Sequence, residues 1–335
     1  MLSAEIKSKI DKLWNNFWSG GISNPLTVIE QISYLLFIKR LDDIDNAKEK
    51  RANRIGRPYT SIFVDLNEKL KADNKSDDNF NWELLKWSQF QHLDVEVMFD
   101  VVSQKVFPAI KMLGGEDSSF TAEMKDAVFM IPKPSLLQES VRLIDGINMD
   151  DADTKGDLYE YLLSKLATSG VNGQFRTPRH IIRMMVELMD PTAEDKICDP
   201  ACGTAGFLVN SLEYTLEKYT RPESVFTDEE GNIHNRIGDM MSNEEWEHFR
   251  NDMFYAFDFD PSMVRIASMN LMLHSLDNPN IKQIDAMSKA YTEENKYTLV
   301  LANPPFKGSI DAGDINPTLE KGAKTTKTEL LFMKL

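Results

Sequence analysis

The residues best suited to chemistry are Asn303-Pro304-Pro305-Phe306. Two successive prolines restrict the backbone and lack amide hydrogens, so the Asn303 side-chain oxygen and the Pro304 carbonyl can both accept from one NH₂ group. An amino group conjugated with an aromatic ring is a weak nucleophile, because its lone pair is delocalised. Two acceptors would localise charge on its nitrogen and favour in-line attack on a methyl sulfonium, while Phe306 offers a flat face for a planar base. The pattern predicts methyl transfer to an exocyclic amine.

A second candidate site is the segment 199–207, Asp-Pro-Ala-Cys-Gly-Thr-Ala-Gly-Phe. It follows an expected strand and opens an expected helix, which is where α/β sheets bind nucleotide-like ligands. Gly203 and Gly206 would let the backbone approach a ligand closely, because a Cβ there would collide with it. The spacing differs from the three-glycine dinucleotide fingerprint, and the Asp199 carboxylate repels phosphate but attracts a cation. S-adenosylmethionine, with an ammonium and a sulfonium, fits this charge pattern better than NAD.

Further candidates lie near the same end of the expected sheet. Asp258 follows the next strand, where a carboxylate can accept hydrogen bonds from both ribose hydroxyls. Asp260 is expected to cap a helix instead. Asp285 follows the strand after that, where its carboxylate could meet the exocyclic amine of the cofactor's adenine. Thr177 is expected to cap a helix that Pro178 opens, and the N-terminus of that helix could hold the carboxylate of the cofactor.

The scaffold for these residues is predicted by the second half of the sequence. Short apolar runs alternate with helical stretches, which is typical of βαβ units on a parallel sheet. Strands are expected at residues 196–199, 253–257, 281–284 and 297–302, and helices at 178–189, 205–219 and 261–274. Residues 221–252, with a turn at 228–232, interrupt the alternation as a polar insertion.

The first 150 residues predict an all-helical domain, because apolar residues recur at helical spacing. Stripes at 6–18 and 28–39 indicate two helices, the second opened by Asn24-Pro25 in the cap and first-turn positions. Further helices are expected at residues 80–89, 95–109 and 135–144, and a loop at 51–59. The acidic residues 149–153 mark the expected boundary between a helical domain, residues 1–150, and an α/β domain, residues 151–335.

Composition excludes several classes of protein. Apolar residues make up 42% of the 335 residues, which is enough for a core and too many for a disordered chain. No apolar run approaches the roughly 20 residues that cross a bilayer, and the N-terminus lacks the layout of a secretory signal. Cys198 and Cys202 fit neither a disulfide framework nor a zinc site, so we expect a cytoplasmic protein without a metal.

The charge balance bears on partners. The sequence has 38 Lys and Arg against 53 Asp and Glu, which gives a net charge of −15. A protein that binds nucleic acid by itself, mainly through phosphates, is expected to have a basic excess. If this chain acts on DNA, another subunit or a local patch must supply much of the positive field.

Taken together, the sequence resembles the methylation (M) subunit of type I restriction-modification systems, a family of N6-adenine DNA methyltransferases. Residues 18–42 are similar to the family's helical N-terminal domain, and the motifs from Gly173 to Phe306 occur in the family's order. The resemblance implies a Rossmann-like sheet of the S-adenosylmethionine-dependent methyltransferase class. It also implies a hetero-oligomer whose partners are DNA, a specificity subunit and a restriction subunit, with no membrane.

The resemblance also assigns roles to individual residues. The target adenine, which such enzymes flip out of the duplex, is assigned to Asn303, Pro304 and Phe306. The S-adenosylmethionine contacts are assigned to Gln174, Phe175, Thr177, Asp199, Ala201, Gly203, Thr204, Gly206, Phe207, Asp258 and Asp285.

The family's catalytic domain continues past the Asn-Pro-Pro-Phe strand with three more strands and a helical segment, whereas this sequence ends at Leu335. We therefore expect a sheet that is truncated on its C-terminal side and leaves an apolar edge to be covered. Two alternatives remain open. One is a non-catalytic chain that binds cofactor or docks to a specificity subunit. The other is a methyltransferase acting on another conjugated amine, such as guanine N2 in RNA, cytosine N4 or a protein glutamine.

Overall fold

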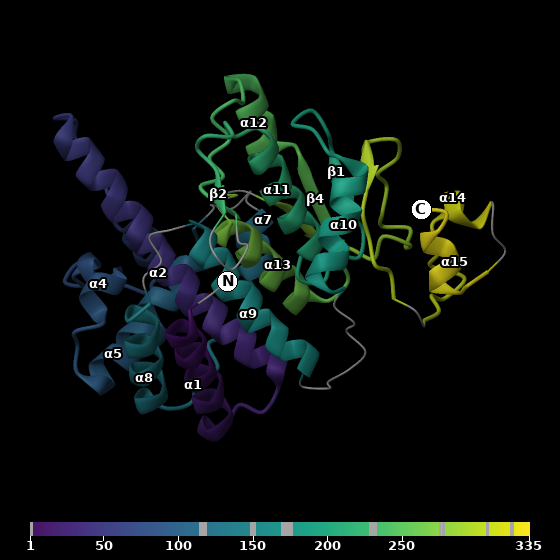
Figure 1. The fold of residues 1–335 in the computed structure, drawn as a ribbon. Helices are drawn as coiled ribbons and strands as arrows, with labels where there is room; N and C mark the ends of the chain where they lie inside the picture. Colours follow the sequence, from purple (N-terminus) through teal and green to yellow (C-terminus); the bar gives the residue numbers. More distant parts are fainter. Residues whose placement is uncertain are drawn as a thin grey trace. The chain divides into compact units, whose positions relative to one another are not determined.

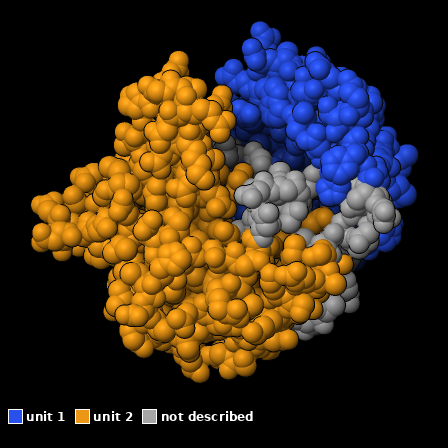
Figure 2. All heavy atoms as spheres, turned by 60° about the vertical axis from the view of Figure 1, so that its left-hand side comes forward, with its two compact units in different colours: residues 1, 172–335 blue, residues 2–171 orange. Residues whose placement is uncertain are grey.

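The computed structural model contains two compact units, one made of residues 2–171 and the other of residue 1 with residues 172–335 (Figure 2). No helix in the described part of the chain is long and apolar enough to span a membrane. The structure describes residues 3–113, 119–147, 152–168, 177–227, 233–274, 276, 279–305, 308–321 and 325–335.

The N-terminal unit is built of helices, as expected (Figure 1). Its longest helix, α2 (Pro25–Arg54), begins after Asn24, whose side chain accepts a hydrogen bond from Leu26 N at 3.0 Å. Helix α2 contacts α1, α4, α8 and α9, so it forms the centre of the unit. The other helices are α1 (Ala4–Gly20), α3 (Ile62–Ala72), η1 (Trp82–Leu85), α4 (Trp87–Phe90), α5 (Val95–Val101), η2 (Val102–Val106), α6 (Phe107–Ile110), α7 (Ser119–Met124), α8 (Pro134–Asp145) and α9 (Ala152–Thr168).

The cap of α2 gives a stability prediction. Replacing Asn24 by alanine removes the acceptor for the Leu26 amide and is expected to lower the free energy of unfolding by about 1 kcal/mol. Urea unfolding followed by circular dichroism measures the change. Asn15, exposed within α1, is the matched control: its replacement by alanine is expected to be neutral or slightly stabilising, because alanine has the higher helix propensity. Equal losses for both variants would contradict the capping role.

Two stretches of the helical unit differ from the sequence expectation. Helix α2 continues to Arg54, into the expected loop at 51–59, and the positive charges of its last turn favour this because they face the negative end of the helix dipole. The expected helix at 80–89 is split into η1 and α4 by Lys86, whose backbone is extended. The Lys86 ammonium lies 3.0 Å from Asp45 Oδ2, so a buried ion pair holds the chain where the helix breaks.

The division between the units falls after residue 171, whereas the sequence pattern indicated a boundary near residue 150. Helix α9 accounts for the difference, because it contacts α1 and α2 of the helical unit.

The C-terminal unit contains the expected parallel sheet. Its strands lie in the order β5 (Asn280–Gln283), β4 (Phe254–Asp258), β1 (Ile197–Asp199) and β6 (Leu299–Val300), and each neighbouring pair is parallel. Strand β1 is central, since Ile197 is in register with Phe254 on one side and Leu299 on the other. The carboxyl ends of parallel strands meet at one end of a sheet, so the segments that follow β1, β4 and β6 lie near one another.

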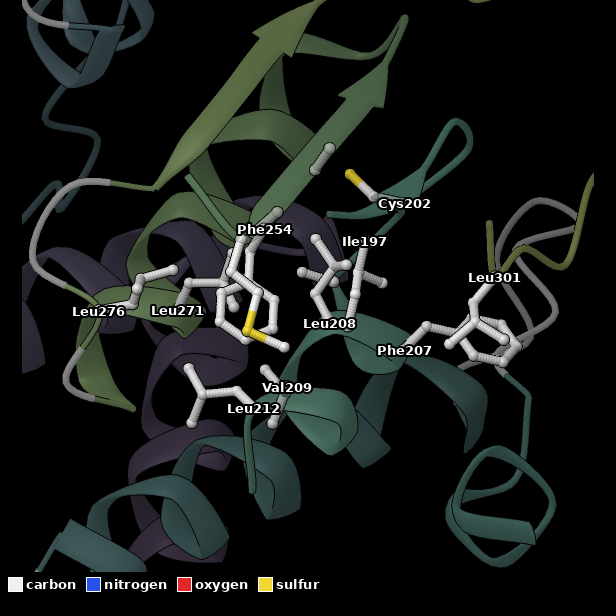
Figure 3. Close-up of a cluster of buried hydrophobic side chains, with 14 of the residues drawn as sticks. Ile197, Cys202, Phe207, Leu208, Val209, Leu212, Phe254, Leu271, Leu276 and Leu301 are labelled. Carbon is white, nitrogen blue, oxygen red and sulfur yellow. The ribbon is translucent and has the colours of Figure 1, made fainter. Parts of the chain in front are cut away.

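Alternate strand residues point to opposite faces of this sheet. Ile197 and Phe254 join a large core with helices α10 (Arg179–Met189), α11 (Gly206–Lys218) and α13 (Pro261–Leu273) (Figure 3). Cys198 and Tyr255 belong to a smaller cluster on the other face. Helices α11 and α13 share one face, as expected for two successive crossovers that advance in the same direction across the sheet.

The insertion between α11 and β4 has structure of its own. Strands β2 (Phe226–Thr227) and β3 (Ile233–His234) pair antiparallel, while the expected turn at 228–232 lies outside the described residues. Helix α12 (Asn243–Asn251) follows, opened by a capping box between Ser242 and Glu245. The short helices α14 (Pro317–Glu320) and α15 (Thr328–Phe332) come after β6.

Candidate active site

The loop from β1 to α11 lies at the end of the central strand. Asp199 is only 1% exposed, and its Oδ1 accepts a hydrogen bond from Ala201 N at 3.1 Å. Gly203 has a φ of +51°, a left-handed conformation that glycine adopts without strain. Apart from its chain neighbours, no described atom lies within 4 Å of where a Cβ of Gly203 would stand. The loop therefore combines a buried carboxyl group with an open stretch of backbone.

Asp258, at the end of β4, faces the same loop. Its Oδ2 accepts from Gly203 N and its Oδ1 from Asp260 N, both at 2.9 Å. Burial raises the pKa of Asp258. Burial, helped by the charge of Asp258, raises the pKa of Asp199 to about 8. Both carboxyl groups would be stabilised in their charged form by a cation, so this end of the sheet favours a positively charged ligand.

Two residues of the expected cofactor segment have structural reasons for their identity. A Cβ at Gly206 would lie 3.2 Å from Ile182 Cδ1, a tight contact, so glycine also helps α10 and α11 to pack closely. The expected approach of a ligand to the Gly206 backbone stays a prediction. Phe207 is 4% exposed and its side chain lies in the large core (Figure 3), which leaves only its backbone for a cofactor. Ala201 and Thr204 are half-buried in the loop.

The two other candidate acids lie after β4 and β5. Asp260 caps α13, as expected, with Oδ1 accepting from Ser262 N at 2.8 Å. Asp285 Oδ1 accepts from Met287 N at 3.0 Å and so holds a turn. Ile284 N donates to Asp258 O at 2.9 Å, which places the start of this turn beside the end of β4. The contact of Asp285 with an adenine stays a prediction.

The turn after β6 contains a long-range contact that the sequence did not indicate. Asn303 Nδ2 donates to Thr177 Oγ1 at 2.9 Å. Thr177 does not cap α10: the helix begins at Arg179, Pro178 occupies the N-cap position, and no side chain caps it. The expected capping role was therefore wrong, because the hydroxyl is engaged by Asn303 instead. Gln174, Phe175 and Phe306 lie outside the described residues.

A cavity of about 650 Å³ borders the same turn. Its lining includes Cys198, Tyr291, Val300 and Pro304, so it lies by the sheet face opposite α11 and α13. Cavities of this volume are within the range that holds small molecules. The Pro304 carbonyl thus belongs to a turn that adjoins a space larger than a nucleobase.

Sequence reasoning missed Asn270. This residue of α13 is fully buried, and its Nδ2 donates to Thr204 O at 2.7 Å, which ties the cofactor loop to the helix. The available signal was a single amide within the mostly apolar stretch of residues 263–273. A polar side chain at a buried helical position normally needs a specific partner.

Replacing Asn270 by alanine is expected to loosen the loop. The lost hydrogen bond to the Thr204 carbonyl, together with the space left behind, should lower the free energy of unfolding by about 1–3 kcal/mol. Replacement by aspartate should cost more, because a carboxylate would face the carbonyl oxygen. Chemical denaturation of both variants measures this. An aspartate variant as stable as the unmodified chain would contradict the contact.

Cys198 and Cys202 are free and buried. Burial raises the pKa of both thiols. Among the described residues, no group of three or more His, Cys, Asp or Glu side chains could hold a metal ion.

An open parallel sheet, a glycine-bearing loop after its central strand and an acid at the end of the next strand define a Rossmann-like α/β class of protein. Comparison with family models narrows this class. The N-6 DNA methylase model matches residues 150–334, and the HsdM N-terminal domain model matches residues 6–144. The chain belongs to the N-6 DNA methylase family, which confirms the resemblance inferred from the sequence.

Two curated proteins similar to this chain are methylase subunits of type I restriction enzymes. The methylase subunit of the type I restriction enzyme EcoEI of Escherichia coli is 22% identical over 100% of this chain and 62% of its own length. The StySJI methylase subunit of Salmonella typhimurium is 29% identical over 100% of this chain and 56% of its own length. This chain thus spans little more than half the length of these relatives.

A solved structure shares the fold. The methyltransferase subunit of a type I restriction-modification system from Streptococcus thermophilus superposes with a TM-score of 0.61 at 16% identity, over 98% of this chain and 71% of that chain. The expected combination of a helical N-terminal region with a methyltransferase-type sheet is therefore confirmed.

Proposed function

We propose that this chain carries the methyl-transfer site of a type I modification subunit and transfers a methyl group from S-adenosylmethionine to N6 of adenine in DNA. The observation that supports this most is the asparagine-proline turn after β6, which lies at the same end of the sheet as the buried Asp199 and the half-buried Asp258. Methyl donor and amine acceptor would then approach each other from neighbouring strand ends.

The residues present fit S-adenosylmethionine, which supplies an electrophilic methyl group and carries positive charge. Asp199 and Asp258 would hold its polar parts, since burial raises the pKa of both groups and a cation would favour their ionised forms. Asp258 already accepts two backbone hydrogen bonds, but a carboxylate has about four acceptor positions and can accept from ribose hydroxyls as well. The open backbone at Gly203 leaves room for close approach.

The acceptor side of the reaction would use Asn303 and Pro304. The Asn303 side-chain oxygen and the Pro304 carbonyl would accept the two hydrogens of the adenine NH₂ group and increase the electron density on nitrogen. The cofactor, when bound, would supply the methyl group: the nitrogen lone pair would form the new N–C bond, and the electron pair of the broken S–C bond would stay on sulfur. The methylated nitrogen is acidic and releases one proton to water, so no side-chain base is needed.

We also propose the partners and setting that the resemblance implies. DNA, a specificity subunit and a restriction subunit would join the chain in a hetero-oligomer in the cytoplasm. The net charge of −15 supports this, because an acidic chain needs a partner to hold DNA phosphates. One solved structure, described as showing complex assembly of the type I restriction-modification system, has the same fold as this chain. Its TM-score is 0.64 at 21% identity.

The direct test combines the chain with a specificity subunit, duplex DNA and radiolabelled S-adenosylmethionine, followed by nucleoside analysis. Label at adenine N6 is the expected result. Label on cytosine N4, on RNA or on protein would support a methyltransferase with a different amine acceptor. Cofactor binding without any transfer would support the non-catalytic alternative and contradict the proposal.

A further inference from the structure

We propose that Thr177 is a positioning residue for the methyl-transfer turn: its hydroxyl holds the Asn303 amide so that Oδ1 faces the methyl acceptor. The observation is the 2.9 Å hydrogen bond from Asn303 Nδ2 to Thr177 Oγ1, between residues 126 positions apart in the sequence. The inference rests on the proposed function of Asn303. It assigns the hydroxyl a role that neither helix capping nor cofactor contact describes.

The orientation of the amide decides whether Asn303 can work. A side-chain amide has an acceptor oxygen and a donor NH₂ of nearly the same shape. If Asn303 turned by half a rotation, it would present NH₂ to the NH₂ of the substrate, and no hydrogen bond would form. With Nδ2 directed at Thr177, the other branch of the amide, Oδ1, is directed away from Thr177. In the orientation seen here the amide can accept from an amine, and its hydrogen bond to the Thr177 hydroxyl holds the side chain in place.

The segment that carries Thr177 is itself anchored. Arg179 donates through Nη2 to both carboxylate oxygens of Glu213 on α11, at 2.9 and 3.2 Å. Pro178, between Thr177 and Arg179, restricts the backbone, and the branched Cβ of Thr177 limits its χ1 rotamers. The start of α10 is therefore tied to α11, the helix that follows the cofactor loop, and the hydroxyl has little freedom to leave Asn303.

A direct cofactor contact is the competing role for Thr177. The two roles differ in what removal of the hydroxyl would change. If the hydroxyl contacts the cofactor, its removal would lower the affinity of the chain for the cofactor. A positioning role would leave that affinity intact and slow the chemical step in the bound complex, because the acceptor geometry would be relaxed.

The first experiment compares T177V, which replaces the hydroxyl by a methyl group of similar size, with T177S, which retains it. S-adenosylhomocysteine affinity is measured by calorimetry, and single-turnover methylation by the assembled enzyme is measured with labelled cofactor. For T177V we expect a rate at least roughly tenfold lower with affinity within about twofold, and for T177S a rate within about threefold of the unmodified enzyme. Tenfold weaker affinity in T177V with an unchanged bound-state rate would overturn the proposal, as would no change in either quantity.

A second experiment needs no turnover. In chain labelled with ¹⁵N at asparagine, the side-chain NH₂ signals of Asn303 are identified by their loss in N303D. We expect their hydrogen exchange to be faster in T177V than in T177S or the unmodified chain, because the hydrogen bond to Oγ1 is absent. Equal exchange in all three would overturn the proposal. If the unmodified enzyme transferred no methyl group, the proposed function would fail, and the exchange data would still decide whether Thr177 holds Asn303.

Discussion

Replacing Asn303 by alanine is expected to lower the single-turnover rate of methyl transfer by roughly a hundredfold to a thousandfold. The side-chain oxygen is one of the two acceptors that would act on the adenine amine, and removal of one such group from a preorganised site has effects of this order. The affinity for S-adenosylmethionine should change by less than about twofold, because the carboxyl groups proposed to hold the cofactor follow β1 and β4 rather than β6.

The control is N243A, which removes an exposed asparagine from the first turn of α12. Its methylation rate should match that of the unmodified enzyme. A rate for N303A within about threefold of the unmodified rate, with folding intact by circular dichroism, would show that Asn303 is a structural turn residue only. The methyl-transfer chemistry proposed for this turn would then be wrong.

The second large effect is expected at Asp199, where one substitution should weaken cofactor binding and stabilise the free protein. The carboxyl group is buried with a pKa of about 8, whereas in the unfolded chain it ionises near its ordinary value, about 3.9. Between these pH values the folded state holds a proton that the unfolded state has lost. The free energy of unfolding therefore falls as pH rises through this window.

The variant D199N retains an oxygen that can accept from Ala201 N but cannot ionise. Without cofactor, it should be more stable than the unmodified chain at pH 8 by more than about 1 kcal/mol, with the difference vanishing below about pH 4. Its affinity for S-adenosylmethionine should be lower by roughly tenfold or more, because a charged hydrogen-bond acceptor is lost.

Urea unfolding at a series of pH values and calorimetric titration measure these two quantities. The matched control is D126N, at an exposed aspartate of the helical unit, which should change neither. A stability difference between D199N and the unmodified chain that did not vary with pH would contradict the raised pKa. Unchanged affinity for S-adenosylmethionine would show that Asp199 does not contribute to cofactor binding.

The features that were predicted correctly depend on residues near one another in the sequence. Asn24 and Asp260 cap helices because each acts on an amide two residues later. The strands β1, β4 and β5 were predicted by short apolar runs, and the carboxyl groups of Asp199 and Asp258 follow from their places at strand ends. Parallel pairing then brings these residues together without further information.

The features that were missed depend on contacts between distant segments. The bond from Asn303 to Thr177, the bond from Asn270 to Thr204 and the ion pair of Lys86 with Asp45 each join side chains that local pattern cannot pair. At residues 86 and 177 a tertiary contact replaced what local propensity favours, a continuous helix and a helix cap respectively. The resemblance assigned Thr177 to the cofactor, but a list of motif residues does not reveal which of them hold one another.

The two buried thiols have a practical consequence for experiments on this protein. Cys198 and Cys202 are buried, and burial keeps their thiols protonated. Reagents that alkylate thiolates should therefore leave both cysteines of the folded chain unmodified. A cysteine introduced at an exposed position such as residue 243 would then accept a single fluorophore without removal of the native ones. The rate at which Cys202 becomes alkylated in the native chain would therefore measure how often the loop beside the central strand opens.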